Sequence, residues 1–391
     1  MQNTKWNLYI LYTGMFLVMA GFGVIIPILP FFARDLGASP LDMGLLVTLF
    51  ALAQFIFAPI WGNYSDRLGR KKILVFSQAG YALSFFLMGM ATSVSVLHLA
   101  RVLGGLLSAA TFPTAHAYIA DFTSKEERTR SLGAMGAALN LGFILGPAAG
   151  GLLAPLGLKM TFFIAGTSIL LTAAATALLL PESPRAARSV SSPQLPGPRA
   201  ILVAINSPLA LFFYLAFAVT FAGSSVFSML SYYMMDKVDA TPAHTAWAFT
   251  VMGATSAVVQ GLFIGRVVDL LGEERTMAVA LALGGLGYLS LSAAGSLTTV
   301  LASLIITSTA MALLRPTITS AISRATTLGQ GLTLGVQSSF DSLGRIVGPL
   351  WAGLTYAYLV EAPYLSAALV FLASLVAVLF THPSRREAAS P

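Results

Sequence analysis

Apolar stretches recur along this chain, and each is long enough to cross a lipid bilayer. A crossing needs about 20 apolar residues in a helix, and only helices or closed barrels satisfy the backbone hydrogen bonds in hydrocarbon. The sequence therefore predicts an all-α membrane protein of twelve transmembrane helices, six in each half. We expect the spans near residues 8–30, 43–61, 73–92, 96–120, 133–154 and 160–180, and then 208–234, 245–268, 277–296, 299–321, 332–356 and 363–381.

The composition excludes a soluble globular protein. Charged residues make up 9% of the chain and hydrophobic residues 57%, whereas charge is about a quarter of a soluble domain. The absence of cysteine excludes disulfides and thiolate metal sites. The first apolar stretch runs past Pro27 and Pro30 without a small-residue cleavage pattern, so we expect a retained span rather than a signal peptide.

The cations predict the orientation of the chain. If both termini lie on one side, sixteen of the 22 Lys and Arg residues fall there and three fall opposite. Cytoplasmic loops carry this excess, so we expect both termini in the cytoplasm of a bacterial cell. The net charge of +7 is then a consequence of topology, and binding to nucleic acid is not needed to explain it.

The two halves repeat one pattern. Residues 62–72 read G-N-Y-S-D-R-L-G-R-K-K, and residues 265–275 read G-R-V-V-D-L-L-G-E-E-R. Three landmarks keep an offset of 203 or 202 residues: Asp66 with Asp269 and Gly69 with Gly272, Pro113 with Pro316, and Gly146-Pro147 with Gly348-Pro349. The chain is therefore predicted to hold two pseudo-symmetric six-helix bundles.

The domain boundaries follow from a polar, proline-rich stretch between the halves. We expect one bundle at residues 1–180, a cytoplasmic linker at 181–207 with a short interfacial helix near 200–205, and a second bundle at 208–391 with a short cytoplasmic tail. Repeats of this kind are typical of secondary transporters, whose substrate sites lie between the repeats. No phosphate-binding G-x-x-x-x-G-K-[ST] loop occurs, so we expect no cofactor and a proton gradient as the energy source.

The 62–72 stretch has the features of a cytoplasmic gate. Gly62 would let two helices approach, while Asp66 could face the positive N-terminus of a neighbouring helix and pair with Arg70. Such contacts form the two-state element that alternating access needs. The alternative is a solvated loop, which would account for cations such as Arg67 and Lys71. The recurrence of Asp and Gly at matched spacing in both halves favours the gate.

These motifs resemble those of a known family. G-x-x-x-D-R-x-G-R-K-K resembles the signature of the major facilitator superfamily, and L-A-R-V-L-G-G at 99–105 resembles its second motif. G-F-I-L-G-P-A-A-G-G at 142–151 resembles the motif of its proton-coupled antiporters. The chain is most similar to the twelve-span multidrug and quinolone efflux pumps of Gram-positive bacteria. The resemblance implies the major facilitator fold, proton-driven multidrug efflux and antibiotic resistance.

The chain departs from that family at two positions. The multidrug relatives carry acids in the seventh and tenth spans, and Phe227 and Ala312 occupy the matching positions here. Organic cations bind such acids, so efflux of cations by that route is in doubt. Arg101, Arg315 and Arg345 against one acid, Asp341, would make the site electropositive, which favours a neutral, zwitterionic or anionic substrate.

Charged and polar residues inside the predicted spans are candidates for substrate contact or coupling. Arg101 would face a cavity, and the resemblance implies a role in proton coupling; the alternative is an Arg that snorkels to the interface. Asp341 and Arg345 are four residues apart, so they form a neutral pair or Asp341 is a protonation site. His116 would titrate or bond a neighbouring helix. Asn140 is a further cavity contact, and Asp121 is a helix-end or gate residue.

A face of small residues marks the fifth span. Gly142, Gly146, Pro147, Gly150 and Gly151 lie at helical spacing, and such faces let backbones approach closely. Its repeat contains Gly348 and Pro349 in the eleventh span. We expect the two helices to meet across the pseudo-twofold axis; ordinary packing is the alternative.

The sequence thus predicts a secondary transporter that exports small amphiphilic molecules, not an enzyme. The alternatives are an exporter of an anionic or zwitterionic metabolite, lipid or metallophore, and a membrane sensor that does not transport. We expect a monomer in the cell membrane.

Overall fold

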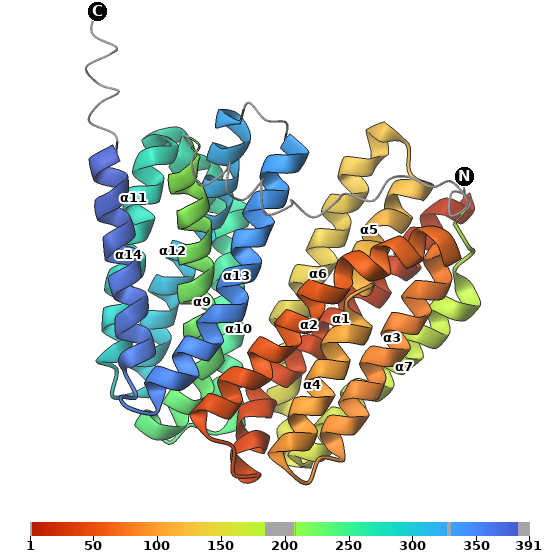
Figure 1. Cartoon of the computed structure of the whole chain (residues 1–391), viewed down its shortest axis with the longest axis horizontal. Coiled ribbons are helices and arrows are strands. Elements are labelled where there is room, and N and C mark those ends of the chain that lie inside the picture. The colour runs from red at the N-terminus through yellow and green to blue at the C-terminus, as the bar shows by residue number, and fades with distance from the viewer. Residues whose placement is uncertain (1, 184–206, 208, 327–329, 382–391) are drawn as a thin grey trace, which may run out of the picture. The chain divides into compact units, whose positions relative to one another are not determined.

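Long α-helices make up nearly all of the computed structural model, which describes residues 2–183, 207, 209–326 and 330–381 (Figure 1). No β-strand occurs in these residues, so the predicted all-α architecture is confirmed. The first half contains α1 (Gln2–Asp35), α2 (Pro40–Leu68), α3 (Arg70–Gly89), α4 (Val94–Ser108), α5 (Thr111–Phe122), α6 (Lys125–Leu153) and α7 (Leu158–Leu179). The second contains α9 (Ala210–Val238), α10 (Pro242–Val258), α11 (Ile264–Ser292), α12 (Leu297–Ala325), α13 (Gln330–Tyr356) and α14 (Ala362–Thr381).

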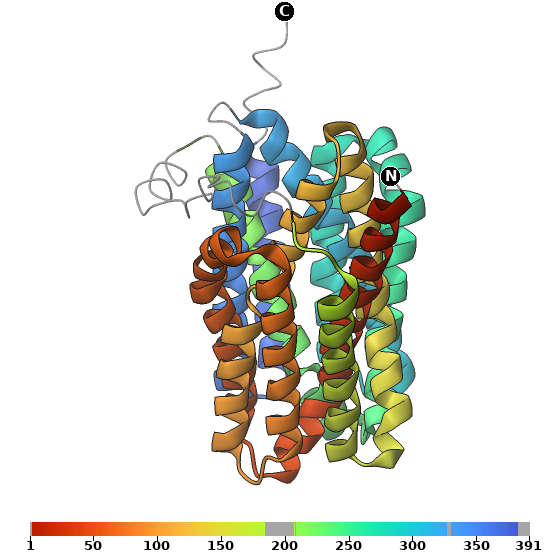
Figure 2. The same ribbon diagram turned by 90° about the vertical axis from the view of Figure 1, so that its right-hand side faces the viewer.

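The chain forms two compact units. One comprises residues 1–194 and 241–250, and the other comprises 195–240 and 251–391. The same helix pairs pack in each. In the first unit α1 packs on α6 and α7, and α3 packs on α4 and α7; in the second, α9 packs on α13 and α14, and α11 packs on α12 and α14. Within each unit the long helices run side by side, as the view turned by 90° also shows (Figure 2). This shared packing is what a duplicated six-helix bundle predicts.

The helix ends follow local sequence rules. Ser39 accepts a hydrogen bond from the Asp42 amide and Asp42 accepts one from the Ser39 amide, which makes a capping box at the start of α2 with Pro40 as the first helical residue. Ser296 and Thr299 form the same box at α12. These boxes satisfy amides that would otherwise be unpaired at a helix start.

The predicted fourth span is divided into two helices. α4 ends at Ser108 and α5 begins at Thr111. Pro113 is the third residue of α5. Proline lacks an amide hydrogen and cannot donate to the carbonyl of Ala109, so the break lies where the helix loses that bond. Pro316 lies inside α12 without ending it.

Ten stretches of the described chain are long and apolar enough to cross a membrane. One of them, Pro242–Ser292, has 51 residues, which is enough for two crossings, and it bends at Gly272, where φ is +76°. α13 is not among the ten; it carries Gln337, Asp341 and Arg345. The ten stretches do not by themselves give the predicted twelve. The predicted interfacial helix near 200–205 lies outside the described residues, as does the C-terminal tail after residue 381.

Candidate functional site

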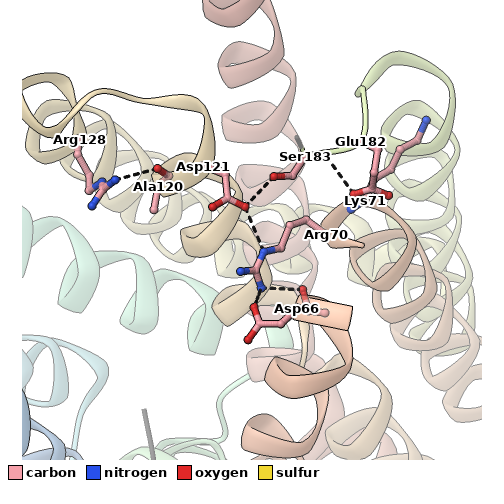
Figure 3. Close-up of polar contacts among 9 residues, drawn as sticks. Asp66, Arg70, Lys71, Ala120, Asp121, Arg128, Glu182 and Ser183 are labelled. Carbon is pink, nitrogen blue, oxygen red and sulfur yellow. Dashed lines mark hydrogen bonds and ion pairs between the residues drawn. The ribbon is translucent and has the colours of Figure 1, made fainter. Parts of the chain in front are cut away.

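A cluster of ion pairs joins α2, α3 and α5 in the first unit (Figure 3). Gly69 is the one residue between α2 and α3, and its φ of +107° lets the chain turn sharply there. This turn brings Arg70 back toward Asp66, with which it forms an ion pair. Arg70 Nε also lies 3.3 Å from Asp121 Oδ2, and Arg70 Nη1 donates to Ser65 Oγ at 3.2 Å.

The cluster is largely shielded from water. The side chains of Arg70 and Asp121 are 13% and 12% exposed. Charge-assisted hydrogen bonds of this kind are stronger than those at a fully wet surface. The structure thus places Asp66, Gly69 and Arg70 together and adds Asp121, while Arg67 is exposed and Lys71 is half-buried. A side chain added at Gly62 would meet nothing within 4 Å, so no close approach occurs at Gly62 in this unit.

Glu182 and Ser183 complete the cluster, and sequence reasoning missed both. Glu182 Oε1 accepts hydrogen bonds from the amides of Lys71 (2.9 Å) and Ser183 (3.0 Å), so its carboxylate caps the start of α3. Ser183 Oγ donates to Asp121 Oδ2 at 2.7 Å. The residues lie at the start of a stretch predicted as linker, and no local pattern marks them as partners of α3.

The second unit repeats the turn at Gly272 and places an ion pair beside it. Glu273 Oε1 lies 3.2 Å from Arg324 Nη2 and accepts a hydrogen bond from Ser320 Oγ at 2.6 Å. Arg324 is 72% exposed, so this pair is far more open to water than the pair in the first unit. Asp269, predicted as part of this gate, is exposed.

Arg101 differs from the expectation that it faces a cavity. Its side chain is buried, with 4% of its surface exposed, between α2 and α3. Nε donates to the Leu46 carbonyl at 2.9 Å, and the guanidinium lies 4.0 Å from the centre of the Phe50 ring. The carbonyl and the aromatic ring both stabilise the cation inside the unit.

The small residues of the fifth span pack closely on another helix of their own unit. A side chain at Gly142 or Gly146 would lie 2.5 Å from the carbonyl oxygens of Phe16 or Ala20, and Gly150 is similarly close to Val24, so this face packs on α1. In the second unit Gly348 packs equally closely on Phe221 of α9. That these two helices meet each other across the pseudo-twofold axis remains a prediction. Small residues reveal a surface of close approach, but the repeat does not say which helix covers it.

A pocket of about 770 Å³ opens in the second unit between α9, α12 and α13. The polar residues of its lining are Thr220 on α9, Arg315, Thr319, Ser320, Ser323 and Arg324 on α12, and Gln337, Asp341 and Arg345 on α13. Residues 337, 341 and 345 are four apart, which puts them on one helix face. This pocket gathers three of the predicted substrate residues.

Hydrogen bonds fix the acid of this pocket. Thr220 Oγ1 donates to Asp341 Oδ1 at 2.8 Å, and Arg315 Nη2 donates to Thr220 Oγ1 at 3.4 Å. Arg345 donates to Ser342 Oγ at 3.3 Å. In the part of the chain that the structure describes, Asp341 and Arg345 form no ion pair within 4.0 Å, although their spacing allowed one.

The remaining candidates lie elsewhere. His116 is exposed, and its Nδ1 lies 2.8 Å from the Phe112 carbonyl of its own helix rather than bonding a neighbouring one. Asn140 is exposed on α6, Phe227 is half-buried on α9, and Ala312 is buried. A second pocket of about 770 Å³ lies between α1 and α7, and its lining side chains, from Trp6 to Leu179, include no charged one.

The sequence profile of the Major Facilitator Superfamily matches residues 11–231 and 212–391, which together span nearly the whole chain. The chain belongs to the Major Facilitator Superfamily. Multidrug resistance protein 2 of Bacillus subtilis is 32% identical to it over 386 residues, 97% of this chain and 96% of the relative. Quinolone resistance protein NorA of Staphylococcus aureus is 32% identical over 390 residues, 97% of this chain and 98% of the relative.

A solved structure supports the superfamily assignment at the level of fold. The crystal structure of the nucleoside transporter NupG aligns with a TM-score of 0.75 at 16% identity, covering 96% of this chain and 98% of that one. The predicted major facilitator fold is therefore confirmed, as is the resemblance to Gram-positive efflux pumps. This member of the superfamily is a multi-span membrane transporter of small molecules, similar to multidrug efflux pumps, and not an enzyme.

Proposed function

We propose that this transporter exports small amphiphilic molecules, drug-like or endogenous, across the bacterial plasma membrane by alternating access, in exchange for protons. The names of its relatives, a multidrug resistance protein and a quinolone resistance protein, support efflux of such compounds. Both relatives match this chain over nearly their full length. The similarity therefore covers the whole protein and is not limited to one domain.

The observation that carries this proposal is the pocket between α9, α12 and α13. Its volume of about 770 Å³ is in the range of pockets that bind drug-sized ligands. Charged groups in the middle of transmembrane helices are costly and mark substrate or ion pathways. Arg315, Asp341 and Arg345 are such groups, and the pocket exposes them together.

The proposed mechanism needs two bundles that move against each other. We propose the bundles at residues 1–180 and 208–391, joined by the linker at 181–207, in a monomer with both termini in the cytoplasm. The Asp66, Arg70 and Asp121 cluster would hold the cytoplasmic end of the first bundle in one state until its ion pairs break. Asp341 and His116 are the candidates for the exchanged proton.

Flux into everted membrane vesicles tests the proposal. Vesicles that contain the transporter should accumulate amphiphilic dyes and drugs when an inside-acid pH gradient is imposed, and dissipation of the gradient should stop the flux. Asp341→Asn should reduce the dependence on the gradient if that acid carries the proton. An absence of flux for every compound would contradict the proposal and favour a membrane sensor.

A second candidate function has one specific observation in its favour. The pocket is lined by three arginines and one acid, so its electrostatics suit an anionic or zwitterionic metabolite, lipid or metallophore better than a cationic drug. Phe227 and Ala312, which replace the family's acids, add no negative charge for a cation. A flux screen that includes both anionic metabolites and cationic drugs separates the two candidate functions, because each predicts flux of its own class of compound.

A further inference from the structure

Two of the three arginines that line the second unit's pocket, Arg315 and Arg345, form no ion pair with a carboxylate in the described residues. Arg315 and Arg345 are both exposed to the pocket, and in the described residues neither forms an ion pair within 4.0 Å. Their hydrogen bonds are long, 3.4 Å to Thr220 and 3.3 Å to Ser342, and both acceptors are neutral hydroxyls. Two cations held so weakly inside a membrane protein are costly unless a negative charge joins them.

Both arginines lie well inside their helices. Arg315 is ten residues from the end of α12. Arg345 is fifteen residues from the start of α13, the next helix in the chain. At a rise of 1.5 Å per residue these positions are about 15 and 22 Å from the helix ends. Neither guanidinium is therefore at a helix end, where lipid headgroups or water would supply its counter-charge.

The charges around the pocket leave it net positive. Asp341 on α13 is the one acid in the lining of the pocket. Thr220 of α9 donates a hydrogen bond of 2.8 Å to this acid. On α12 Arg324 also lines the pocket, but Glu273 of α11 neutralises it at 3.2 Å. Arg315 and Arg345 thus outweigh Asp341 by one charge, and a ligand with a single negative charge would balance the pocket.

A buried acceptor indicates a second feature of the ligand. Gln337 is 9% exposed and lines the same pocket; its Nε2 donates to Thr319 Oγ1 at 2.8 Å. Thr319 in turn donates to the Arg315 carbonyl, which fixes the amide orientation. Among the residues that the structure describes, none donates a hydrogen bond to Gln337 Oε1. A buried acceptor without a donor is costly, so a ligand N–H or O–H beside the anionic group would satisfy it.

We infer that the α9, α12 and α13 pocket is an anion-binding subsite, in which Arg315 and Arg345 hold a carboxylate-type headgroup and Gln337 accepts a hydrogen bond from a donor next to it. The apolar residues Ala216, Val219, Ile318 and Leu334 line the rest of the pocket and would contact the hydrophobic part of the ligand. The substrate class is then an amphiphilic organic anion. This inference rests on the proposed transport function, whose substrate it specifies.

The inference also bears on the exchanged proton. A proton on Asp341 removes the pocket's one negative charge, so a proton and an anion bind there cooperatively rather than in competition. Antiport requires competition. For an anionic substrate the proton would therefore be exchanged at a group other than Asp341.

Calorimetric titration of the full-length transporter in lipid nanodiscs tests the subsite. The probes are naphthaleneacetate, its uncharged amide naphthaleneacetamide and the cation naphthylethylammonium, which share one ring system. The acetate should bind about tenfold or more tightly than either other probe, the difference expected for a charge-assisted hydrogen bond. Arg315→Gln and Arg345→Gln should each remove the preference, and Asp341→Asn should strengthen acetate binding. Arg266→Gln, which removes an exposed cation of α11 outside the pocket, is the matched control and should bind like the wild type.

Two results would overturn the inference: equal affinity for the acetate and the amide, or a preference that survives in the Arg315→Gln/Arg345→Gln double variant. Flux of the same purified variants, measured in proteoliposomes under an imposed pH gradient, separates this inference from the proposed function. If the transporter prefers the acetate but shows no flux of any compound, the subsite is supported and the proposed transport function is contradicted. If uncharged or cationic compounds show gradient-driven flux and the acetate is not preferred, the proposed transport function is supported and the anion-binding subsite is contradicted.

Discussion

Glu273 and Arg324 form an ion pair, Oε1 to Nη2 at 3.2 Å, at the positions that lie 203 residues after Arg70 and Asp121. The two units therefore carry the same pair at the same place with the charges exchanged. The exchange preserves the attraction between the two helices of each unit while the residue types diverge. It also shows that the repeat conserves an interaction that a comparison of residue identities does not detect.

The ion pair of Arg70 and Asp121 is shielded from water, whereas the pair of Glu273 and Arg324 is open to it. Removing the shielded pair should therefore cost more stability than removing the open one. Arg70→Gln removes contacts to Asp66, Asp121 and Ser65 in a shielded cluster. We expect a loss of about 2 kcal/mol or more of stability and of transport, with membrane insertion intact. Glu273→Gln should cost about 1 kcal/mol or less, because its partner Arg324 is 72% exposed. Thermal unfolding of the purified variants and vesicle flux measure both effects.

A charge exchange supplies the control for this prediction. Glu273→Arg combined with Arg324→Glu restores the attraction and should recover most of what either single variant loses. If the double variant is no better than the single variants, the pair does not act through its charges.

Gly69→Ala should destabilise the cluster for two separable reasons. At φ of +107° a residue with a Cβ is strained by roughly 1–3 kcal/mol, and the Cβ would lie 2.6 Å from Glu182 Oε2. Gly157→Ala is a matched control, because Gly157 has nearly the same backbone at the start of α7, with φ of +105°, and open space around it. We expect both variants to unfold at lower temperature and only Gly69→Ala to lose transport.

The same comparison tests the role of Glu182. Adding Glu182→Ala to Gly69→Ala should relieve the contact but leave the backbone strain. Equal transport in Gly69→Ala and Gly157→Ala would mean that the contact between Gly69 and Glu182 has no part in gating.

The glycine faces should tolerate no side chain. In Gly146→Ala the new Cβ would lie 2.5 Å from the Ala20 carbonyl oxygen, so α6 must shift away from α1 at an expected cost of about 1–3 kcal/mol. Gly348→Ala should have the same effect on α13 and α9, where the Phe221 carbonyl is 2.6 Å away. Gly136→Ala, on α6 with no atom within 4 Å, should unfold at or slightly above the temperature of the wild type, because Ala favours a helix more than Gly does. A normal unfolding temperature for Gly146→Ala would show that this face is loosely packed.

Acid should weaken the end of the second unit where α9 meets the start of α14. Lys237 at the end of α9 pairs with Glu361, and this hydrogen bond lowers the pKa of Glu361 below its ordinary value. A lowered folded-state pKa contributes stability that is present above the unfolded pKa, near 4.3 for Glu, and is lost as the pH falls through the lower folded-state pKa. The unfolding temperature of Glu361→Gln should thus fall less steeply below about pH 4.3 than that of the wild type.

Asp239→Asn provides the control for acid sensitivity. Asp239 is an exposed acid at the same end of α9, and its αL backbone, with φ of 48°, also suits Asn. It should keep the wild-type pH profile. Identical profiles for Glu361→Gln and the wild type would contradict the role of the Lys237 pair.

The sequence predicted the helices, and it singled out Gly69 and Gly272, because both signals are local. Apolar length determines a span, and the glycines at 69 and 272 are needed wherever the chain must take a positive φ. The offset of 203 residues predicted the duplicated packing. The break between α4 and α5 was equally local, since Pro113 removes the bond to the Ala109 carbonyl, but apolar length alone hid it.

The partners of side chains could not be predicted in the same way. The Glu182 carboxylate reaches the Lys71 amide across 111 residues of sequence, and no pattern near either residue signals that contact. The charge of Arg101 suggested a cavity, but the Leu46 carbonyl and the Phe50 ring bury it. The spacing of Asp341 and Arg345 suggested a pair, but Thr220 of another helix holds the acid instead.

Flux of labelled amphiphiles into proteoliposomes under an imposed pH gradient tests the central claim most directly, with wild type and Asp66→Asn compared at equal insertion. Asp66 is the partner of Arg70 in the cluster. The account predicts gradient-dependent accumulation by the wild type and none by Asp66→Asn, with both proteins folded. Equal flux by the two proteins, or none by the wild type for any compound, would contradict it.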